Sequence, residues 1–298
     1  MAKNVNTFTF KKKSVKMRTF DWINYILLGV FVLITFYPIW YVVICSLNEG
    51  PDFMSGGIWL YPRAFTSLNY EIVFGDSKLW NAFAVTVFKT LFGTFFGLLF
   101  TTIVAYSMSR KELKYRNFFY WLNMFTMFFG GGLVPYYLII RATGLYNTFA
   151  VYIIPALYSV YNMIVISSFF RGIPNELHEA TIMDGASEFI TLFAVYIPLA
   201  KPILATVGLW LSVGHWNGYF GTMVYTEGGK LTTLQYYLLQ LIKQTTAPDN
   251  MDAESMEKIV SETVSYAAMV VATIPILCVY PFLQKFFTKG IALGSLKG

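Results

Sequence analysis

Six apolar runs, each long enough to cross a lipid bilayer, dominate this sequence of 298 residues. A bilayer core about 30 Å thick requires about 20 apolar residues for each helical span. The runs are 22–48, 80–109, 118–140, 149–170, 203–225 and 265–287. Because backbone groups in hydrocarbon have to pair internally, each run predicts a helix. The sequence therefore predicts an all-α polytopic membrane protein with six transmembrane helices.

Low charge supports this class, because charged residues make up 13% of the chain, against about 25% in soluble domains. The first run is uncharged over 27 residues, which is longer than the 7–15 residues or so of a signal-peptide core. We therefore expect it to be retained as a span. The boundaries predicted from these runs are a basic N-terminus at 1–20, a first helix with its external loop at 21–79, a region with the remaining spans at 80–285 and a tail at 286–298.

The distribution of charge sets the predicted topology. Segments 1–20, 110–117 and 285–298 are strongly basic, whereas 49–79 and 226–264 are net acidic. Basic loops stay in the cytoplasm, so both termini are predicted to be cytoplasmic. The net charge of +6 follows this topology and does not indicate nucleic-acid binding.

One inner segment, 171–201, departs from this trend, with four acidic and two basic residues. Pro174 suits the first turn of a helix, and Gly185 suits a stop that needs positive φ. Apolar residues at spacings of three and four then predict a second helix through Phe189 and Tyr196. An acidic cytoplasmic loop suggests a protein surface as its partner; an ordinary amphipathic surface helix is the alternative.

This segment also carries a family resemblance. It contains Glu179-Ala180-Thr181, then Asp184-Gly185-Ala186, then Ile197-Pro198. In this spacing it resembles the EAA loop of permease subunits in ATP-driven importers, with Thr181 in place of the second alanine. The resemblance to the sugar-importer branch extends over nearly the whole chain.

The resemblance implies a type I ABC importer permease fold in the bacterial plasma membrane. The implied partners are a second permease in a heterodimer, two ATPase subunits and an external solute-binding protein. ATP and Mg would be used by the ATPase subunits, and this chain would bind no cofactor.

By the same resemblance, 174–188 is the coupling helix that docks on an ATPase. The implied coupling residues are Glu179, Ala180, Asp184, Gly185, Ala186 and Pro198. The tail resembles one that enters the ATPase interface, with Gly294, Ser295, Leu296, Lys297 and Gly298 as contacts; a disordered basic end is the alternative.

Two irregular places within the spans are candidates for the substrate pathway. Gly131 and Pro135 interrupt the third span, which predicts a bend along the path or, alternatively, close helix packing. His215, Trp216 and Asn217 lie in the fifth span, where polar groups should face protein or a water-filled cavity. We expect a cavity wall there; an interhelical hydrogen bond that fixes packing is the alternative.

Lys89 lies nine residues inside the second span, where a lysine costs about 3 kcal/mol on insertion scales. The hypothesis is that it faces the central cavity and, with Arg141, attracts an anionic substrate. Pairing with a carboxylate of a partner subunit, or snorkelling, is the alternative. Segments 126–135 and 284–298 also resemble the branch that carries acidic oligosaccharides, so an alginate-type or aldouronate-type oligosaccharide is the narrowest substrate prediction.

No arrangement of residues predicts catalysis. The two histidines, His178 and His215, lie in different segments and predict no metal site, and there is no phosphate-binding G-x-x-x-x-G-K-[ST] loop. An ion-coupled secondary transporter would usually need carboxylates inside the membrane, or paired broken helices, to hold the coupling ion, and none of the six runs contains Asp or Glu. A membrane scaffold without a transport role is the other alternative, and it would not need an EAA loop.

Overall fold

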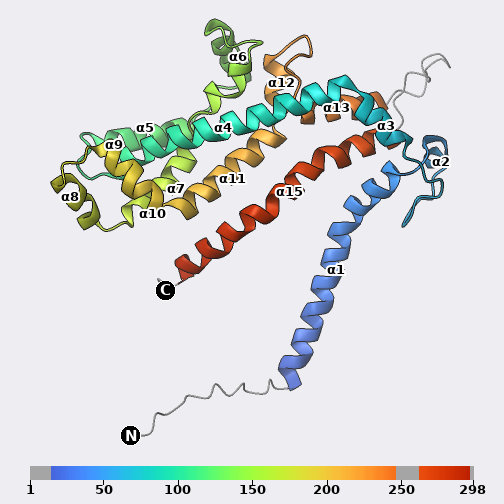
Figure 1. The fold of residues 1–298 in the computed structure, drawn as a ribbon, viewed down its shortest axis with the longest axis horizontal. Coiled ribbons are helices and arrows are strands. Elements are labelled where there is room, and N and C mark those ends of the chain that lie inside the picture. Colours follow the sequence, from blue (N-terminus) through green and yellow to red (C-terminus); the bar gives the residue numbers. More distant parts are fainter. Residues whose placement is uncertain (1–14, 246–261, 296–298) are drawn as a thin grey trace.

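The computed structural model describes residues 15–245 and 262–295, with side chains described for 19–244 and 262–278. The described residues form helices and no β-strand (Figure 1), apart from an isolated bridge between Asn48 and Phe65. This confirms the prediction of an all-α fold. The predicted basic N-terminus up to residue 14, the loop 246–261 and residues 296–298 lie outside the described residues.

The helices differ widely in length. The longest are α1 (Val15–Ser46), α4 (Ser77–Ser109), α11 (Lys201–Asn217) and α15 (Glu262–Ser295). Helices of intermediate length are α5 (Arg116–Phe128), α6 (Leu133–Ala142), α7 (Val160–Arg171), α8 (Asn175–Met183) and α13 (Leu234–Thr245). The short helices are α2 (Gly50–Met54), α3 (Leu68–Gly75), α9 (Glu188–Thr191), α10 (Ile197–Leu199) and α12 (Phe220–Tyr225). Single turns complete the chain: η1 (Phe149–Tyr152), η2 (Ile154–Ala156) and the π-helical η3 (Leu192–Tyr196).

The centre of the bundle is α4, against which α7 and α11 pack. Glycines on α4 permit this close approach. A Cβ at Gly97 would lie 3.3 Å from the carbonyl oxygen of Ala156, and a Cβ at Gly93 would lie 2.6 Å from the ring of His215. The small residues of α4 therefore set how closely its neighbours can approach.

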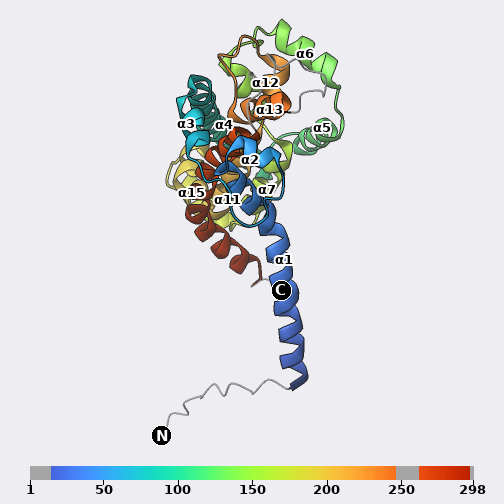
Figure 2. The same ribbon diagram turned by 90° about the vertical axis from the view of Figure 1, so that its right-hand side faces the viewer.

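One end of the bundle is formed by α8, α9 and α10 around the last turn of α4, and we call it the α8 end (Figure 1). The opposite end is formed by α2, α3 and α13, where α15 packs on α3 and α13. The C-terminal part of α1 packs on α15 there, and the rest of α1 extends away from the bundle (Figures 1 and 2). Its apolar span is not buried within the chain.

Two helices are long and apolar enough to cross a membrane, namely 19–46 of α1 and α4. Three bent pairs pass the same test together: α5 with α6 at 113°, η1–η2 with α7 at 46°, and the α9–α10 segment with α11 at 86°. The part of α15 whose side chains are described, Glu262–Cys278, is a shorter apolar helix. The number of six spans, the domain boundaries and the cytoplasmic location of both termini stay predictions.

Three elements differ from their sequence-based prediction. The fourth predicted span, 149–170, begins with the short turns η1 and η2 and becomes α-helical only at Val160. The fifth predicted span is broken, because α11 ends at Asn217 and Gly218 is extended, with φ −74° and ψ 112°. The predicted helix after Gly185 changes to the π-helical turn η3 before Pro198. Proline has no N–H to donate to a carbonyl one turn earlier, so regular α-helical pairing cannot continue through it.

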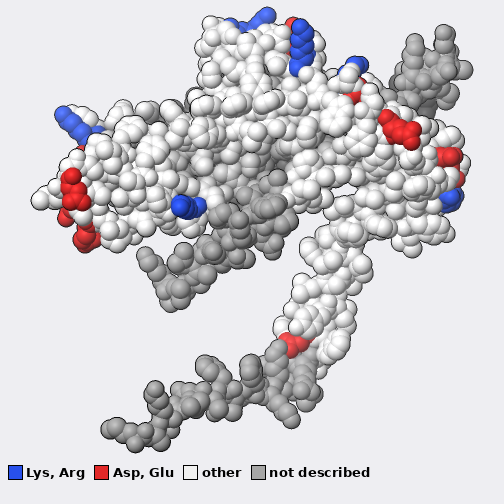
Figure 3. Space-filling view, in the orientation of Figure 1, with Lys and Arg blue, Asp and Glu red and all other residues white. Residues whose placement is uncertain are grey.

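Charged side chains lie mainly at the two ends of the bundle and on the part that carries α6 and α12, at the top of the view (Figure 3). In this view a cluster of acidic side chains covers the α8 end, further acidic groups lie near α2 and α3, and the surface between them is largely uncharged. This pattern is typical of a protein whose middle lies in hydrocarbon.

Candidate coupling surface and transport path

The hairpin that follows α7 is shaped by one glycine. Gly185 has φ +81°, a conformation in which a residue with a Cβ is strained. The N–H of Ala186 donates to Thr181 O and the N–H of Gly185 donates to Ile182 O. These are the two hydrogen bonds of a Schellman motif, which ends a helix with glycine in the left-handed position. The predicted stop at Gly185 is therefore formed by a defined backbone motif.

The predicted coupling residues mostly lie on the outside of this hairpin. Glu179, Ala180, Asp184 and Gly185 are exposed, Ala186 is half-buried, and Met183 beside them is 87% exposed. We call these residues the coupling surface. Pro198 is also exposed, but it lies on α10 and not on the hairpin. The surface combines carboxylates with an exposed apolar side chain, which suits contact with another protein.

Glu179 is held in place within its own helix. Its Oε1 accepts a hydrogen bond of 2.6 Å from Asn175 Nδ2, one turn earlier. The Asn175 amide thus orients a carboxylate that is otherwise free to rotate in solvent. Pairing of Glu179 with a basic group of a partner stays a prediction.

Thr181, which departs from the family pattern, makes two hydrogen bonds with its hydroxyl. Its Oγ1 donates to His178 O at 2.7 Å and accepts from Thr191 Oγ1 at 3.2 Å. Thr191 is fully buried in α9. The hydroxyl of Thr181 therefore joins the two arms of the hairpin. The sequence shows the two threonines of this contact, ten residues apart.

The loop between α4 and α5 reaches the same end of the molecule. Arg110 lies 3.3 Å from the carboxylate of Glu112. The pKa of Glu112 is lowered, first by a hydrogen bond from the Glu112 backbone and also by the positive charge of Arg110. Arg110 also donates to Tyr196 Oη at 3.0 Å. The charged residues of this loop thus contact the segment that carries the coupling surface.

Lys89 is buried, with 5% of its surface exposed. Its Nζ donates to the carbonyl oxygen of Gly218 at 2.6 Å and lies 5.1 Å from the centre of the Tyr152 ring. A cation at the C-terminal end of a helix is favoured by the helix dipole, and Gly218 ends α11. Lys89 therefore holds the break in the fifth predicted span, and its attraction of an anionic substrate stays a prediction.

The three polar residues of the fifth predicted span lie in different surroundings. His215 and Trp216 are 7% and 8% exposed, whereas Asn217 is exposed. The Trp216 ring packs edge-on to Phe83 at 6.1 Å. Asn217 Oδ1 lies 3.5 Å from Gln235 Nε2. Of the three, only Asn217 presents its side chain outside the packed bundle.

The glycines near Pro135 lie at the sharpest bend among the paired helices. The chain turns by 113° between α5 and α6, and Gly132 has φ +86°. A Cβ on Gly131 would meet only the Pro135 Cβ, at 4.0 Å. The bend is therefore present, and within the described part of the chain no other element packs closely on Gly131.

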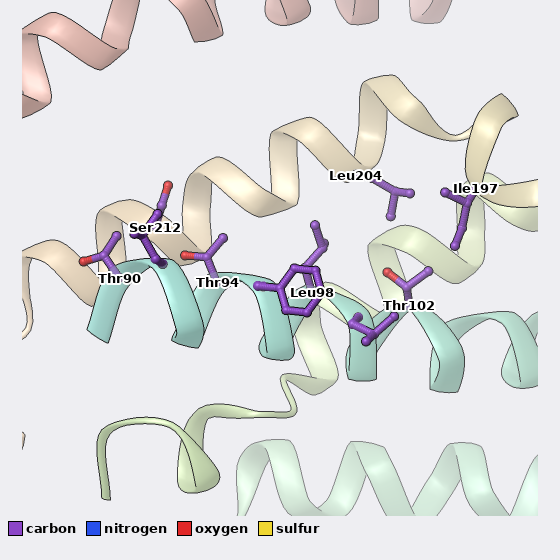
Figure 4. A pocket seen from close by; sticks show the side chains of 10 residues that line it. Thr90, Thr94, Leu98, Thr102, Ile197, Leu204 and Ser212 are labelled. Carbon is purple, nitrogen blue, oxygen red and sulfur yellow. The ribbon is translucent and has the colours of Figure 1, made fainter. Parts of the chain in front are cut away.

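A groove of about 430 Å³ lies between α4 and α11 (Figure 4). Its lining is largely apolar, and it includes hydroxyl-bearing residues at four-residue spacings along α4. The lining residues are Thr90, Leu91, Thr94, Phe95, Leu98, Leu99, Thr102, Ile197, Leu204 and Ser212. Within the described residues, the hydroxyls of Thr90, Thr94 and Thr102 have no hydrogen-bond partner. Sequence reasoning missed this groove, although the threonine spacing was visible.

Arg141, the predicted companion of Lys89, lies elsewhere. Its guanidinium stacks over the rings of Tyr137 and Tyr146, 5.7 Å and 4.9 Å from their centres. Tyr146 donates to Glu227, and this hydrogen bond is the main reason why the pKa of Tyr146 rises to about 12. Among the described residues there is no group of three His, Cys, Asp or Glu side chains that could hold a metal ion.

Comparison with known proteins covers nearly the whole chain. The model of the family "Binding-protein-dependent transport system inner membrane component" matches residues 7–293. Protein LplC of Bacillus subtilis (strain 168) is 35% identical over 285 residues, which are 94% of this chain and 96% of LplC. The polygalacturonan/rhamnogalacturonan transport system permease protein YtcP of the same organism is 32% identical over 286 residues, or 95% of this chain and 100% of YtcP.

A solved structure gives a similar result. A chain from a crystal structure of a bacterial ABC transporter involved in the import of the acidic polysaccharide alginate is 34% identical, with a TM-score of 0.85. The similarity covers 93% of this chain and 99% of that chain.

Proposed function

Because the chain belongs to the family of binding-protein-dependent transport system inner membrane components, we propose that it is a permease subunit of an ATP-driven oligosaccharide importer. Its role is translocation, and it carries no chemistry of its own. With a second, different permease it forms the path across the bilayer. Two ATPase subunits, which use ATP and Mg, dock on the inner side, and an external solute-binding protein delivers the oligosaccharide.

The observation that carries this proposal is the coupling surface. It presents Glu179 and the Asp184–Gly185 turn outward on a hairpin fixed by its own backbone bonds. An exposed, rigid and acidic hairpin at the end of an apolar bundle suits docking on a basic cleft. Closure of the ATPase pair then moves the hairpin and shifts the bundle between its two access states.

We further propose that the oligosaccharide is acidic, of the alginate or oligouronate type. The names of YtcP and of the alginate transporter support this class. Lys89 would supply a cation along the path, if a different state of the bundle frees it from Gly218. The proposed path residues are Lys89, Gly131, Pro135, His215, Trp216 and Asn217, and the tail 294–298 is proposed to contact the ATPase subunits.

Copurification and uptake test the proposed role together. The chain is expressed with its permease and ATPase partners, purified, and reconstituted in vesicles with the solute-binding protein. We expect uptake that requires both ATP and the binding protein. A double variant, Glu179→Lys with Gly185→Pro, should lose the ATPase, whereas Glu71→Lys at the opposite end should retain it. Uptake driven by an ion gradient without an ATPase would contradict the proposal and favour a secondary transporter. Absence of any uptake by an intact complex would favour a scaffold.

The charge preference is tested with Lys89→Ala. Uptake of an oligogalacturonate and of a neutral arabino-oligosaccharide is measured for this variant and for Lys78→Ala, which removes an exposed lysine from the first turn of α4. If Lys89 attracts the anion, the acidic substrate alone should lose about tenfold, equivalent to about 1.4 kcal/mol. An equal loss for both substrates would contradict the charge role and leave Lys89 as a support for Gly218.

A further inference from the structure

Glu188, the first residue of α9, contacts two different helices with its two carboxylate oxygens. Tyr106, near the end of α4, donates its hydroxyl to Glu188 Oε2. His178 of α8 places its Nε2 3.5 Å from Glu188 Oε1. One carboxylate thus joins the helix of the coupling surface to the helix at the centre of the bundle.

The two partners of Glu188 are fixed by packing, whereas Glu188 itself is not. Tyr106 and His178 are 5% and 7% exposed, and the Glu188 side chain is 59% exposed. The Tyr106 ring stacks edge-on against Tyr196 and Phe170, with centroid distances of 4.9 Å and 6.2 Å. The carboxylate therefore spans two anchored groups from the solvent side and contributes little to the core itself.

Few other side-chain contacts join the coupling helix to α4. Arg110, directly after α4, reaches Asn175 Oδ1 at 3.5 Å, at the limit of a hydrogen bond. The Tyr106 hydroxyl, by contrast, donates to a charged acceptor, and such bonds are about twice as strong as neutral ones. Through Glu188, the contacts Tyr106–Glu188 and Glu188–His178 join α4, α9 and α8 by one carboxylate, and we call them the carboxylate bridge; its arm to His178 spans 3.5 Å, like the contact of Arg110 with Asn175.

The helix held by this bridge also reaches the middle of the bundle. Tyr106 and Lys89 both lie on α4, 17 residues and about 25 Å apart along its axis. Lys89 holds the Gly218 carbonyl at the break between α11 and α12. A displacement at the carboxylate bridge is therefore carried to that break by one continuous helix.

We propose that Glu188 is a positioning residue, which couples movement of the hairpin to movement of α4 through Tyr106 and His178. This rests on the proposed function, because the movement it transmits is the one imposed by the docked ATPase. With the bridge intact, α8 and α4 move as one body. Without it, the hairpin tilts about the Gly185 turn while α4 stays in place.

The test measures coupling rather than assembly. Tyr106→Phe, Glu188→Gln and Glu188→Ala are made in the complete complex, with Tyr161→Phe as the matched control. Tyr161 is half exposed on α7, and its hydroxyl makes no hydrogen bond within the part of the chain whose side chains the structure describes. The readouts are ATPase copurification, thermal stability, basal ATP hydrolysis and oligosaccharide taken up per ATP.

We expect Tyr106→Phe and Glu188→Ala to retain the ATPase and basal hydrolysis, and to lower uptake per ATP about tenfold, in line with loss of a hydrogen bond to a charged group. Glu188→Gln keeps an acceptor of the same size and should lose less. The double variant Tyr106→Phe with Glu188→Ala should be no worse than Glu188→Ala alone, because Glu188→Ala already removes the hydrogen bond that Tyr106→Phe deletes. Tyr161→Phe should behave as the unaltered chain.

Two results would overturn the inference. One is unchanged uptake per ATP in Glu188→Ala, whose exposed position leaves folding intact. The other is a loss of thermal stability in all three variants that accounts for the loss of uptake, which would make the bridge purely structural. If the unaltered complex shows no ATP-dependent uptake at all, the proposed function fails before the bridge is tested.

Discussion

The two ends of the bundle are held together by different kinds of polar contact. At the α8 end, the hairpin is joined to α4 by a largely exposed carboxylate, Glu188, and by the Arg110 guanidinium. At the opposite end, Asn69 is 4% exposed and makes three hydrogen bonds: its amide donates to Ser46 O and Asn48 O, and it accepts from Thr263 Oγ1.

Because of this difference, we expect the contacts at the opposite end to contribute mainly to stability, and those at the α8 end to permit movement. A buried, satisfied and neutral network is costly to open, because each group left unpaired loses its hydrogen bond without gaining water. An exposed charged contact exchanges with water at small cost. The opposite end is thus built to stay in one arrangement, whereas the α8 end has contacts that can break and reform during a cycle. The following predictions test this division, beginning with the largest effect.

Asn69→Leu should give the largest loss of stability. It removes the amide that donates to the carbonyl groups of Ser46 and Asn48, at a cost of roughly 3 kcal/mol or more. Thermal unfolding of the purified protein in detergent measures the change. Asn81→Leu is the matched control, because Asn81 is exposed and its amide makes one bond, to Lys230 O. Equal unfolding midpoints for the two variants would contradict the proposed role of the buried Asn69 network in stability.

Gly185→Ala should cost roughly 1–2 kcal/mol, the strain of a Cβ in a left-handed conformation. There is open space around this position, so the cost is conformational and not steric. Gly75→Ala, also in open space but without positive φ, should be nearly neutral. Because the strain falls on the hairpin, ATPase retention should drop together with stability. If retention is unchanged in Gly185→Ala, the turn does not shape the docking surface.

Thr181→Ala restores the alanine of the family pattern and should nevertheless destabilise the hairpin. It removes the partner of the buried Thr191 hydroxyl, at a cost of about 1 kcal/mol. Hydrogen exchange of α8 amides is the measurement that localises this loss. Thr35→Ala provides a control, since its hydroxyl bonds only to carbonyls of its own helix. Identical exchange in the two variants would show that the Thr181–Thr191 contact contributes nothing.

The smallest expected effect is on the pH dependence of stability, through Asp52. Asn48 donates to Asp52 Oδ2 at 2.9 Å and Arg63 lies 3.3 Å from the same oxygen, and these contacts lower the pKa of Asp52. A lowered pKa in the folded state adds stability above the unfolded-state pKa, which is lost as the pH falls through the folded value. Between about pH 6 and pH 3, around the usual Asp pKa, Asp52→Asn should flatten the fall of the unfolding midpoint slightly. A steeper fall in the variant would contradict this sign.

Much of the architecture was predictable from the sequence. The apolar runs predicted a helical membrane protein because hydrocarbon forces the backbone to pair internally. The stop at Gly185 was predictable because glycine tolerates positive φ, and the bend near Pro135 because glycine and proline weaken a helix.

What could not be predicted depends on contacts between distant residues. The break at Gly218 involves Lys89, 129 positions earlier, and sequence alone does not say which carbonyl a buried lysine will find. Glu188 was visible as one of four acidic residues of its loop, but its bridge to Tyr106 arises only when α4 and α9 meet. The π-helical turn before Pro198 follows from the missing N–H of that proline, but the burial of Tyr196 within it, which is 1% exposed, depends on packing against other helices.

The central claim is that the coupling surface faces an ATPase inside the cell, and a single cysteine tests it most directly. Met183→Cys places a thiol at a position that is 87% exposed. The exposed Cys278 is replaced by serine, and Cys45 is buried. The account predicts that a membrane-impermeant maleimide labels Met183→Cys only from the cytoplasmic side, and that the docked ATPase protects it and crosslinks to it. Labelling from the outside of intact cells, without protection by the ATPase, would contradict the account.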